Sequence, residues 1–170
     1  YMSKFIKEDD ILSSYVSYTF DAINAEIYPS LIRGNTLHII GNTVRNDINL
    51  LHRYLINNKI TWLTLPSIVA IEFCLFDLSV TFLRAIVFGG DVFNGIRYEK
   101  IKYLNQYGPT ESTICATLHE YKVGDLSSNI GKPISNTHAY VVGKNLSPVP
   151  IGAIGELYVG GLGVFSGYLN

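Results

Sequence analysis

The chain has 170 residues, of which 48% are hydrophobic and 16% are charged, so it can bury the core of one ordinary domain or two small subdomains and is not intrinsically disordered. Its formal net charge of -1 comes from 13 basic and 14 acidic residues, which argues against a surface that attracts nucleic acid or anionic membranes. The two cysteines, Cys74 and Cys115, lie in apolar sequence and form no metal-binding or redox pair, which indicates reduced, buried thiols.

The sequence shows no targeting or membrane-spanning segment. No apolar core of a signal peptide follows the charged first ten residues. The longest apolar stretch, residues 62–76, is interrupted by Pro66 and Glu72 and is too short to cross a bilayer. Together with the cysteines, this predicts a cytoplasmic protein. Because the chain begins at Tyr1 and ends without a stop-like tail, we expect it to be a piece of a longer polypeptide.

Residues 46–106 alternate between helical and extended patterns. A helix is expected up to residues 57–58, because apolar residues recur at three-and-four spacing behind the capping candidates Asn46 and Asp47. Strands that alternate with helices form right-handed crossovers and a parallel sheet with helices on its faces. The pattern predicts these further segments: a strand over 60–65 ending at Pro66, a helix from Ser67 to about 76, a strand over 83–88, a helix over about 94–101 and a strand over 103–106.

The pattern changes after about Tyr121, because glycine and proline become frequent. Residues 139–142 and 155–159 are typical of short strands joined by turns. We therefore expect a fold of the α/β class, with a flavodoxin-like parallel sheet and flanking helices, followed by a small antiparallel subdomain that forms part of a β-barrel. The expected division places the first subdomain at 1–125 and the second at 126–170.

Residues 105–114, Asn-Gln-Tyr-Gly-Pro-Thr-Glu-Ser-Thr-Ile, combine groups that suit a nucleotide and its metal ion. The ring of Tyr107 can stack on a base, and Gly108-Pro109 favours a turn that exposes backbone donors. Thr110 and Glu111 can face a phosphate and a cation. On these residues alone, a strand-end turn with a surface acid explains the segment equally well.

The predicted topology favours the ligand-binding interpretation. Ligands of open parallel sheets bind beyond the carboxyl ends of the strands. Three loops are expected at such ends: 64–66, Gly89-Gly90-Asp91 and 107–111. Their convergence would form one site.

Four segments in the same order resemble the adenylation domains of nonribosomal peptide synthetases, members of the adenylate-forming superfamily. The Asn-x-Tyr-Gly-Pro-Thr-Glu element is the most specific of them, and Gly-Glu-Leu at 155–157 is also informative. The segments are Phe20-Asp21-Ala22 with Glu26-Ile27-Tyr28-Pro29, then Gly89-Gly90-Asp91, then 105–111, and finally 130–134 with 150–152, 155–161 and Gly167-Tyr168-Leu169.

The resemblance implies that the parent enzyme condenses an amino acid with ATP and passes the acyl group to the phosphopantetheine thiol of a carrier protein. By position, Asn105 would hydrogen-bond adenine, Tyr107 would stack on it, and Thr110 would approach the phosphate. Glu111 would help to hold Mg²⁺, which prefers oxygen ligands. The backbone of Gly89 and Gly90 would lie beside the base, where a side chain would obstruct close approach. The implied nucleotide-binding residues are Gly89, Gly90, Asn105, Tyr107, Gly108 and Thr110.

The resemblance also implies an amino-acid pocket in which Asp21 pairs with the substrate ammonium. Without the resemblance, Asp21 is better explained as a helix cap. A mostly apolar lining favours a hydrophobic or aromatic substrate, because a charged side chain would find no partner, while Gln106 can bond a hydroxyl or amide. Taken singly, Ile86, Phe88 and Ile114 are more often plain core residues, so their place in the pocket rests on the resemblance. The implied pocket residues are Asp21, Ala22, Ala25, Thr64, Ile86, Phe88, Gln106, Ile114 and Cys115.

Several family features are missing or changed. Asp91 stands where the family often has Glu, and Phe165-Ser166 replaces a common Ala-Arg. The sequence has no phosphate loop ending in Pro-Lys-Gly, no Thr-Gly-Asp segment and no C-terminal subdomain with a catalytic lysine. Because that lysine would stabilise the charge of the transition state, we expect these 170 residues alone to be inactive and to need the remaining adenylation subdomains as partners.

Two other functions remain open. An acyl-CoA or aryl-acid ligase of the same superfamily would share the Tyr-Gly-Pro-Thr-Glu turn, although Asp21 would then lack an amine partner. A non-catalytic subdomain that acts as an exchangeable specificity module is the third possibility. A dinucleotide-binding oxidoreductase is disfavoured, because no Gly-x-Gly-x-x-Gly fingerprint follows a predicted strand.

Overall fold

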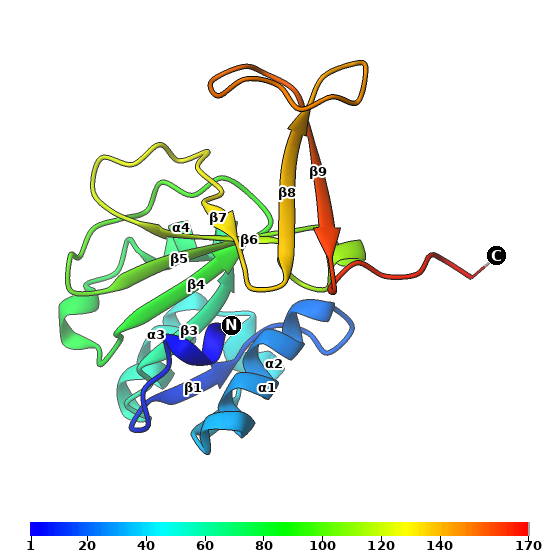
Figure 1. Cartoon of the computed structure of the whole chain (residues 1–170). Coiled ribbons are helices and arrows are strands. Elements are labelled where there is room, and N and C mark those ends of the chain that lie inside the picture. The colour runs from blue at the N-terminus through cyan, green and yellow to red at the C-terminus, as the bar shows by residue number, and fades with distance from the viewer. Residues whose placement is uncertain (170) are drawn as a thin grey trace.

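A seven-stranded sheet with the order β2-β1-β3-β4-β5-β6-β7 forms the centre of the molecule in the computed structural model, which describes residues 1–169 (Figure 1). The first five strands are parallel to their neighbours, and β6 and β7 continue the sheet in antiparallel pairs. The expected α/β class with a parallel sheet is confirmed. The strands are β1 Ile11–Ser14, β2 Thr36–Ile39, β3 Trp62–Pro66, β4 Ala85–Gly89, β5 Lys102–Tyr107, β6 Thr117–Tyr121 and β7 Lys132–Pro133.

Helices connect the parallel strands. The expected helix after Asp47 is confirmed: the Asp47 carboxylate accepts hydrogen bonds from the backbone N–H groups of Asn49 at 2.8 Å and Leu50 at 3.2 Å, which caps α3. The α-helices are α1 Asn24–Arg33, α2 Asn42–Arg45, α3 Ile48–Asn57 and α4 Ser67–Phe73; the short 3₁₀ helices are η1 Met2–Lys4, η2 Asp21–Ile23, η3 Leu78–Val80 and η4 Thr110–Ser112.

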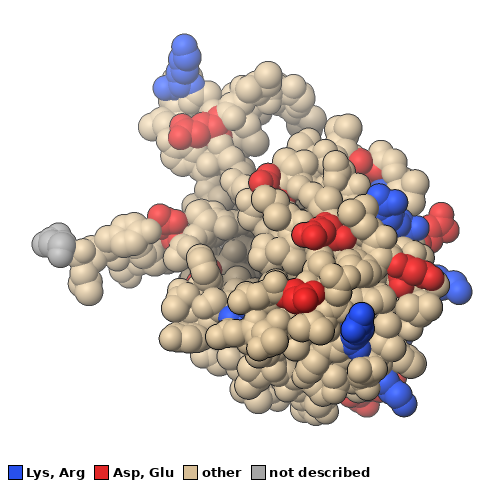
Figure 2. All heavy atoms as spheres, turned by 180° about the vertical axis from the view of Figure 1, so that it is seen from behind, with Lys and Arg blue, Asp and Glu red and all other residues tan. Residues whose placement is uncertain are grey.

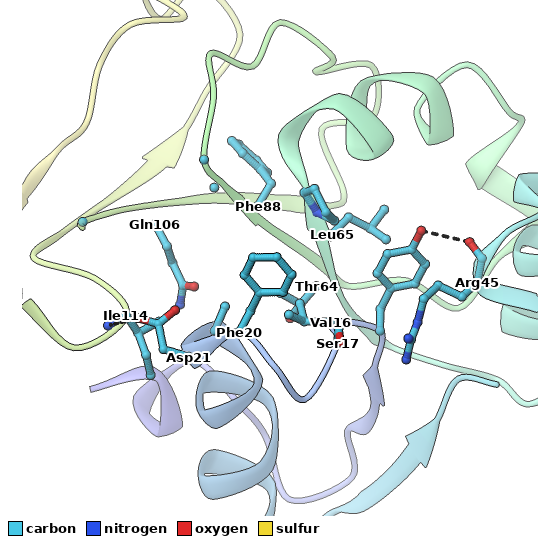
Figure 3. A pocket seen from close by; sticks show the side chains of 16 residues that line it. Val16, Ser17, Phe20, Asp21, Arg45, Thr64, Leu65, Phe88, Gln106 and Ile114 are labelled. Atoms are coloured by element: carbon cyan, nitrogen blue, oxygen red, sulfur yellow. Dashed lines mark hydrogen bonds between the residues drawn. The ribbon is translucent and has the colours of Figure 1, made fainter. Parts of the chain in front are cut away.

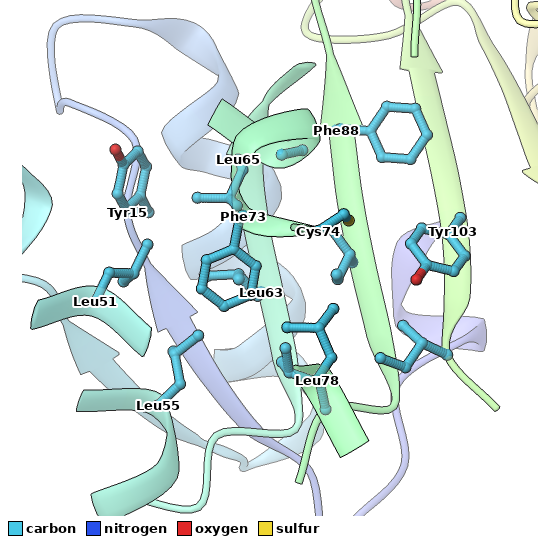
Figure 4. Packing of buried hydrophobic residues seen from close by; sticks show 14 of the residues in the cluster. Tyr15, Leu51, Leu55, Leu63, Leu65, Phe73, Cys74, Leu78, Phe88 and Tyr103 are labelled. Carbon is cyan, nitrogen blue, oxygen red and sulfur yellow. The ribbon is translucent and has the colours of Figure 1, made fainter. Parts of the chain in front are cut away.

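Alternate residues of the central strands pack on opposite faces of the sheet. On one face, Leu63 and Phe88 join a cluster with Leu51 of α3 and Phe73 of α4 (Figure 4). On the other face, Trp62, Ala85, Val87 and Leu104 pack with Met2 and Ile6 near η1. Both faces of these strands are therefore buried, which explains why their sequences are almost continuously apolar.

The helix predicted over about 94–101 is wrong. Residues 91–99, all of which the structure describes, contain no helix. Phe93 is buried with its ring 3.9 Å from that of Phe88, measured between centroids, and a Cβ on Gly95 would collide with the Phe93 ring. Tertiary packing of this aromatic side chain therefore overrides a helical pattern that contains a glycine.

The second predicted helix is shorter than expected, since α4 ends at Phe73 and not at about residue 76. The ring of Phe76 stacks on His52 at 4.8 Å between centroids. Asp77 then accepts a hydrogen bond from Ser79 N and caps η3. These contacts turn the chain toward β4 immediately after α4.

An antiparallel hairpin of β8 Thr137–Val142 and β9 Glu156–Gly161 stands out from the edge of the main sheet (Figure 1). The expected small antiparallel part is thus confirmed. Strand β7 belongs to the larger sheet, so strand pairing continues past residue 126, and the division at 125 and 126 stays a prediction. After β9 the chain returns to η4, where Phe165 N donates to Glu111 O at 2.9 Å.

Acidic and basic side chains are interspersed on the face shown in Figure 2, in keeping with the near-zero net charge. Among residues 1–169, no helix has the length and hydropathy needed to cross a membrane. The charges on the face shown in Figure 2 therefore do not build a field of a single sign.

Candidate ligand-binding site

The first cavity, of about 520 Å³, opens at the carboxyl ends of β3, β4 and β5 (Figure 3). This is the edge of the sheet at which parallel α/β folds bind ligands. The loops expected to converge here do so. Its lining consists of Tyr15, Val16, Ser17, Phe20, Asp21, Ala22, Arg45, Thr64, Leu65, Pro66, Phe88, Gly89, Gly90, Gln106, Gly108 and Ile114.

Asp21 lies at one end of this cavity beside the segment that follows the Tyr107 turn. Its Oδ2 accepts a hydrogen bond from Ile114 N at 3.3 Å, and Ala116 N donates to Tyr107 O at 2.8 Å. Asp21 is the first residue of η2, and neither η2 nor α1 has a side-chain cap. The carboxylate therefore joins the β1–α1 loop to the turn after β5 and does not cap a helix.

The predicted pocket residues divide among three environments. Most line the first cavity. Ala25 and Cys115 instead line a separate, smaller cavity of about 250 Å³, to which Gln106 and Ile114 also contribute. Ile86 is fully buried in the hydrophobic core. The residues that line the first cavity are Asp21, Ala22, Thr64, Phe88, Gln106 and Ile114.

Gln106 lines both the first cavity and this smaller one, and its side-chain N–H donor makes no hydrogen bond in the described part of the chain. It is 9% exposed, and its Nε2 is buried without a hydrogen-bond partner in the described part of the chain. A buried donor of this kind is uncommon in native proteins. It suits a ligand that presents a hydrogen-bond acceptor.

The second cavity, of about 410 Å³, adjoins the Tyr-Gly-Pro-Thr-Glu turn. Its lining includes Gly90, Asn105, Tyr107 and Gly108, and Tyr107 remains 40% exposed. Asn105 is buried, and its Nδ2 donates to Asn129 O at 3.3 Å. Four of the predicted nucleotide residues therefore meet at one cavity, whereas Gly89 lines only the first cavity. Thr110 follows in η4 and lines neither of these two cavities.

The two glycines at the end of β4 have different roles. Gly90 has φ of +93°, and a Cβ there would meet nothing within 4 Å, so backbone conformation requires glycine. A Cβ on Gly89 would collide with the carbonyl oxygen of Gln106 in the neighbouring strand. Strand packing therefore explains Gly89 without any ligand, and the expected place of both glycines beside a base stays a prediction.

Glu111 presents an ionised carboxylate at the surface of η4. The Tyr168 hydroxyl donates to Glu111 Oε1 at 2.7 Å, and this hydrogen bond lowers the pKa of Glu111. Within residues 1–169, no group of three or more His, Cys, Asp or Glu side chains is arranged to hold a metal ion. One carboxylate fits Mg²⁺, because this cation is commonly held by one or two carboxylates together with substrate phosphates and water.

The expected loop 64–66 contributes Leu65 and Pro66 to the first cavity. Sequence reasoning missed other parts of its lining: Tyr15, Val16, Ser17, Phe20 and Arg45. No sequence signal pointed to Arg45, since it comes from α2 in the crossover between β2 and β3. Figure 3 shows its side chain at the opposite end of the labelled residues from Asp21, Gln106 and Ile114.

Comparison with known proteins agrees with this geometry. A family model described as "AMP-binding enzyme" matches residues 2–169. Bacitracin synthase 1 of Bacillus licheniformis is 36% identical over 97% of this chain and 3% of its own length. Tyrocidine synthase 1 of Brevibacillus parabrevis is 36% identical over 97% of this chain and 16% of its own length.

Solved structures show the same arrangement. The N-terminal subdomain of Klebsiella oxytoca NpsA in complex with 3-hydroxybenzoyl-AMSN has a TM-score of 0.83 at 25% identity, covering 97% of this chain and 43% of that one. The artificially fused adenylation-PCP di-domain NpsA-ThdA has a TM-score of 0.84 at 26% identity, covering 97% of this chain and 33% of that one.

The fold and cavities define an α/β protein with cavities at the carboxyl edge of its sheet, the edge at which folds of this kind bind ligands. The chain belongs to the AMP-binding enzyme family. The resemblance to adenylation domains of nonribosomal peptide synthetases is confirmed. The chain spans only a small part of the curated relatives that it matches.

Proposed function

We propose that the chain is part of an adenylation domain that activates an amino acid. In this reaction a carboxylate oxygen of the amino acid bonds to the α-phosphorus of ATP and pyrophosphate leaves, which yields an aminoacyl adenylate. The acyl group then passes to a carrier-protein thiol, and AMP leaves. The observation that carries the proposal is the placement of Asp21 and the Tyr107 turn at adjoining cavities, which share Gly90, Gln106 and Gly108.

The first cavity is proposed as the amino-acid site. The Asp21 carboxylate would pair with the substrate ammonium and thereby orient the reacting carboxylate. Aromatic rings from Tyr15, Phe20 and Phe88 contribute to a mostly apolar wall, which favours a hydrophobic or aromatic side chain. The unused Gln106 donor could bond an acceptor on that side chain.

The second cavity is proposed as the nucleotide site. Asn105 would bond adenine, the exposed ring of Tyr107 would stack on it, and Thr110 would approach the phosphates. Glu111 would hold Mg²⁺, which neutralises phosphate charge when bound. The role of these residues is to bind and orient ATP relative to the amino acid.

The 170 residues by themselves are proposed to be inactive. Support comes from the missing phosphate loop, Thr-Gly-Asp segment and catalytic lysine, and from the 43% of the NpsA subdomain that the chain covers. The partners proposed for the parent polypeptide are the remaining adenylation subdomains and a carrier protein.

Amino-acid-dependent exchange between ATP and pyrophosphate in the parent polypeptide tests the proposal. All standard amino acids should be screened. Strict dependence on a hydrophobic or aromatic amino acid is the expected result. No exchange with any amino acid or other carboxylic acid would contradict catalysis and leave a non-catalytic specificity module.

An aryl-acid ligase is the second candidate, because the similar NpsA subdomain was solved with 3-hydroxybenzoyl-AMSN. Such an enzyme needs no partner for an α-ammonium group. Exchange driven by an aryl acid without an amine, and not by amino acids, would favour this function. The presence of Asp21 at the first cavity favours the amino-acid activating enzyme.

Replacement of Asp21 tests its role directly. In the parent polypeptide, Asp21→Ala should raise the KM for the amino acid by about 10-fold to 100-fold, since a charge-assisted hydrogen bond contributes about 1.5–3 kcal/mol. Exchange kinetics at varied amino-acid concentration measure this effect. Asp21→Asn is the matched variant, because it keeps an oxygen that can accept from Ile114 N but removes the charge. An unchanged amino-acid KM in both variants would refute the proposed pairing.

A further inference from the structure

Glu26 is a buried acidic residue that the proposed reaction does not use. It lies in the first turn of α1 and is only 2% exposed. Its Oε1 accepts hydrogen bonds from Tyr15 N at 3.1 Å and Val16 N at 3.2 Å. Because β1 ends at Ser14, this carboxylate satisfies backbone donors just beyond the carboxyl end of the strand.

These hydrogen bonds close the loop of residues 15–26 onto itself. One end of the loop is the Tyr15–Val16 backbone and the other is the start of α1. Figure 3 shows several residues of this loop around the first cavity. The loop residues that line the cavity are Tyr15, Val16, Ser17, Phe20, Asp21 and Ala22. Glu26 therefore joins the two ends of a segment that forms one wall of the cavity.

Burial of the Glu26 carboxylate carries a cost for folding. Burial raises the pKa of Glu26 to about 7, although the hydrogen bonds from Ser14, Val16 and Tyr15 and the charge of Arg45 oppose the increase. Glu26 Oε2 is buried without a hydrogen-bond partner in the described part of the chain. Burying such a group opposes folding when it is ionised, whereas its hydrogen bonds with Tyr15 N and Val16 N favour the closed form of the loop.

We propose that Glu26 is a positioning residue for amino-acid binding. By holding Tyr15 and Val16 against α1, it fixes the loop that places Asp21 at the first cavity. This inference rests on the proposed amino-acid activation, and it extends the determinants of that site to a residue that does not line the cavity.

The test compares two variants of Glu26 in the parent polypeptide. Glu26→Ala removes the acceptor of two backbone donors, so the amino-acid KM should rise by about 10-fold, while the KM for ATP stays near the wild-type value. Glu26→Gln keeps an amide oxygen as acceptor and should restore most of the amino-acid affinity. The readout is exchange kinetics with amino acid and ATP varied separately.

Ser30→Ala is the matched control on the same helix. Ser30 is fully buried, and its Oγ donates only within the helix, to Ile27 O at 2.7 Å. This variant should lower stability without changing either KM. If Glu26→Ala behaves in the same way, Glu26 is purely structural and the proposal is overturned.

Two further outcomes have defined meanings. A Glu26→Gln enzyme as impaired as Glu26→Ala would overturn positioning through hydrogen bonds, because the loss would then follow the charge. If the wild type shows amino-acid-dependent exchange and Glu26→Ala has an unchanged amino-acid KM, the role of Glu26 is overturned and the proposed function stands. Absence of amino-acid-dependent exchange in the wild type would overturn the proposed function and this role with it.

Discussion

The hydroxyl of Tyr168 donates a hydrogen bond to Glu111 across 57 positions of sequence. Nothing in the Tyr-Gly-Pro-Thr-Glu segment itself indicates this partner. The bond stabilises the ionised carboxylate and lowers the pKa of Glu111, while the same contact raises the pKa of Tyr168. The segment that follows β9 therefore favours the charged form of the proposed metal ligand.

Tyr168→Phe should raise the pKa of Glu111 toward its ordinary value, because the donor that favours the carboxylate is lost. The effect appears in an NMR titration of the Glu111 carboxyl group in the chain itself. Tyr140→Phe, which changes an exposed tyrosine of β8, serves as the control. A Glu111 titration that is identical in all three proteins would show that the hydrogen bond is not formed in solution.

At the scale of single elements, a buried ion pair ties together segments that precede three different strands. Arg84, just before β4, donates its Nε to Asp10 Oδ1 at 3.0 Å, and its Nη2 contacts the other carboxylate oxygen. Asp10 directly precedes β1 and also accepts from Thr61, which precedes β3. Arg84 Nη2 donates further to Phe5 O. One carboxylate thus aligns the amino ends of β1, β3 and β4.

Asp10→Ala should destabilise the fold by about 3 kcal/mol, because the partly buried Arg84 loses its counter-ion. Urea unfolding at pH 7 measures this difference. Glu120→Ala removes the partner of Lys102 in an exposed pair and should cost less than about 1 kcal/mol. Equal effects of the two substitutions would contradict the structural role of Asp10.

The same ion pair predicts a dependence on pH. Burial alone would raise the pKa of Asp10, but hydrogen bonds from Arg84, Lys7 N and Thr61 outweigh it and lower the pKa below 3.8. The contribution of Asp10 is then complete above pH 3.8 and is lost as the pH falls through the lower folded-state value. The wild type and Asp10→Ala should therefore approach each other in stability at strongly acidic pH.

Elements differ in how far local sequence predicts them. Helix α3 follows from its apolar spacing and the Asp47 cap, both of which are local. The segment 94–101 has a comparable pattern, yet Phe93 packs on Phe88 and Tyr103 and no helix forms. The decisive contact there comes from other strands, so a local pattern could not predict it.

At the scale of the whole molecule, the hairpin of β8 and β9 is joined to the main sheet through few contacts near the site. Just after β9, Thr113 Oγ1 donates to Gly163 O at 2.6 Å, and Phe165 N donates to Glu111 O at 2.9 Å. Ile134, which precedes the hairpin, packs against the core cluster that contains Trp62 and Leu104. The large sheet and its core are therefore complete at about residue 134.

A chain that ends at Ile134 should keep cooperative unfolding, because β7 and the contact of Ile134 with the core are retained. A chain that ends at Asp125 should be less stable, since it loses both. Urea unfolding followed by near-ultraviolet circular dichroism compares the two truncations with the full chain. Equal stability of the truncated chains would instead support a subdomain boundary at residue 126.

The sequence by itself determined the parallel strands β3, β4 and β5, helix α3, the antiparallel C-terminal part and the family, because apolar runs, a helix cap and a contiguous motif are properties of neighbouring residues. It predicted neither β1 nor β2. Only the tertiary structure decided which predicted pocket residues share a cavity. It separated Ala25, Cys115 and Ile86 from Asp21, and it brought Arg45 to the cavity and Glu26 to the backbone that forms its wall. The physical reason is that crossovers and packing determine where distant segments meet, and no local pattern contains that information.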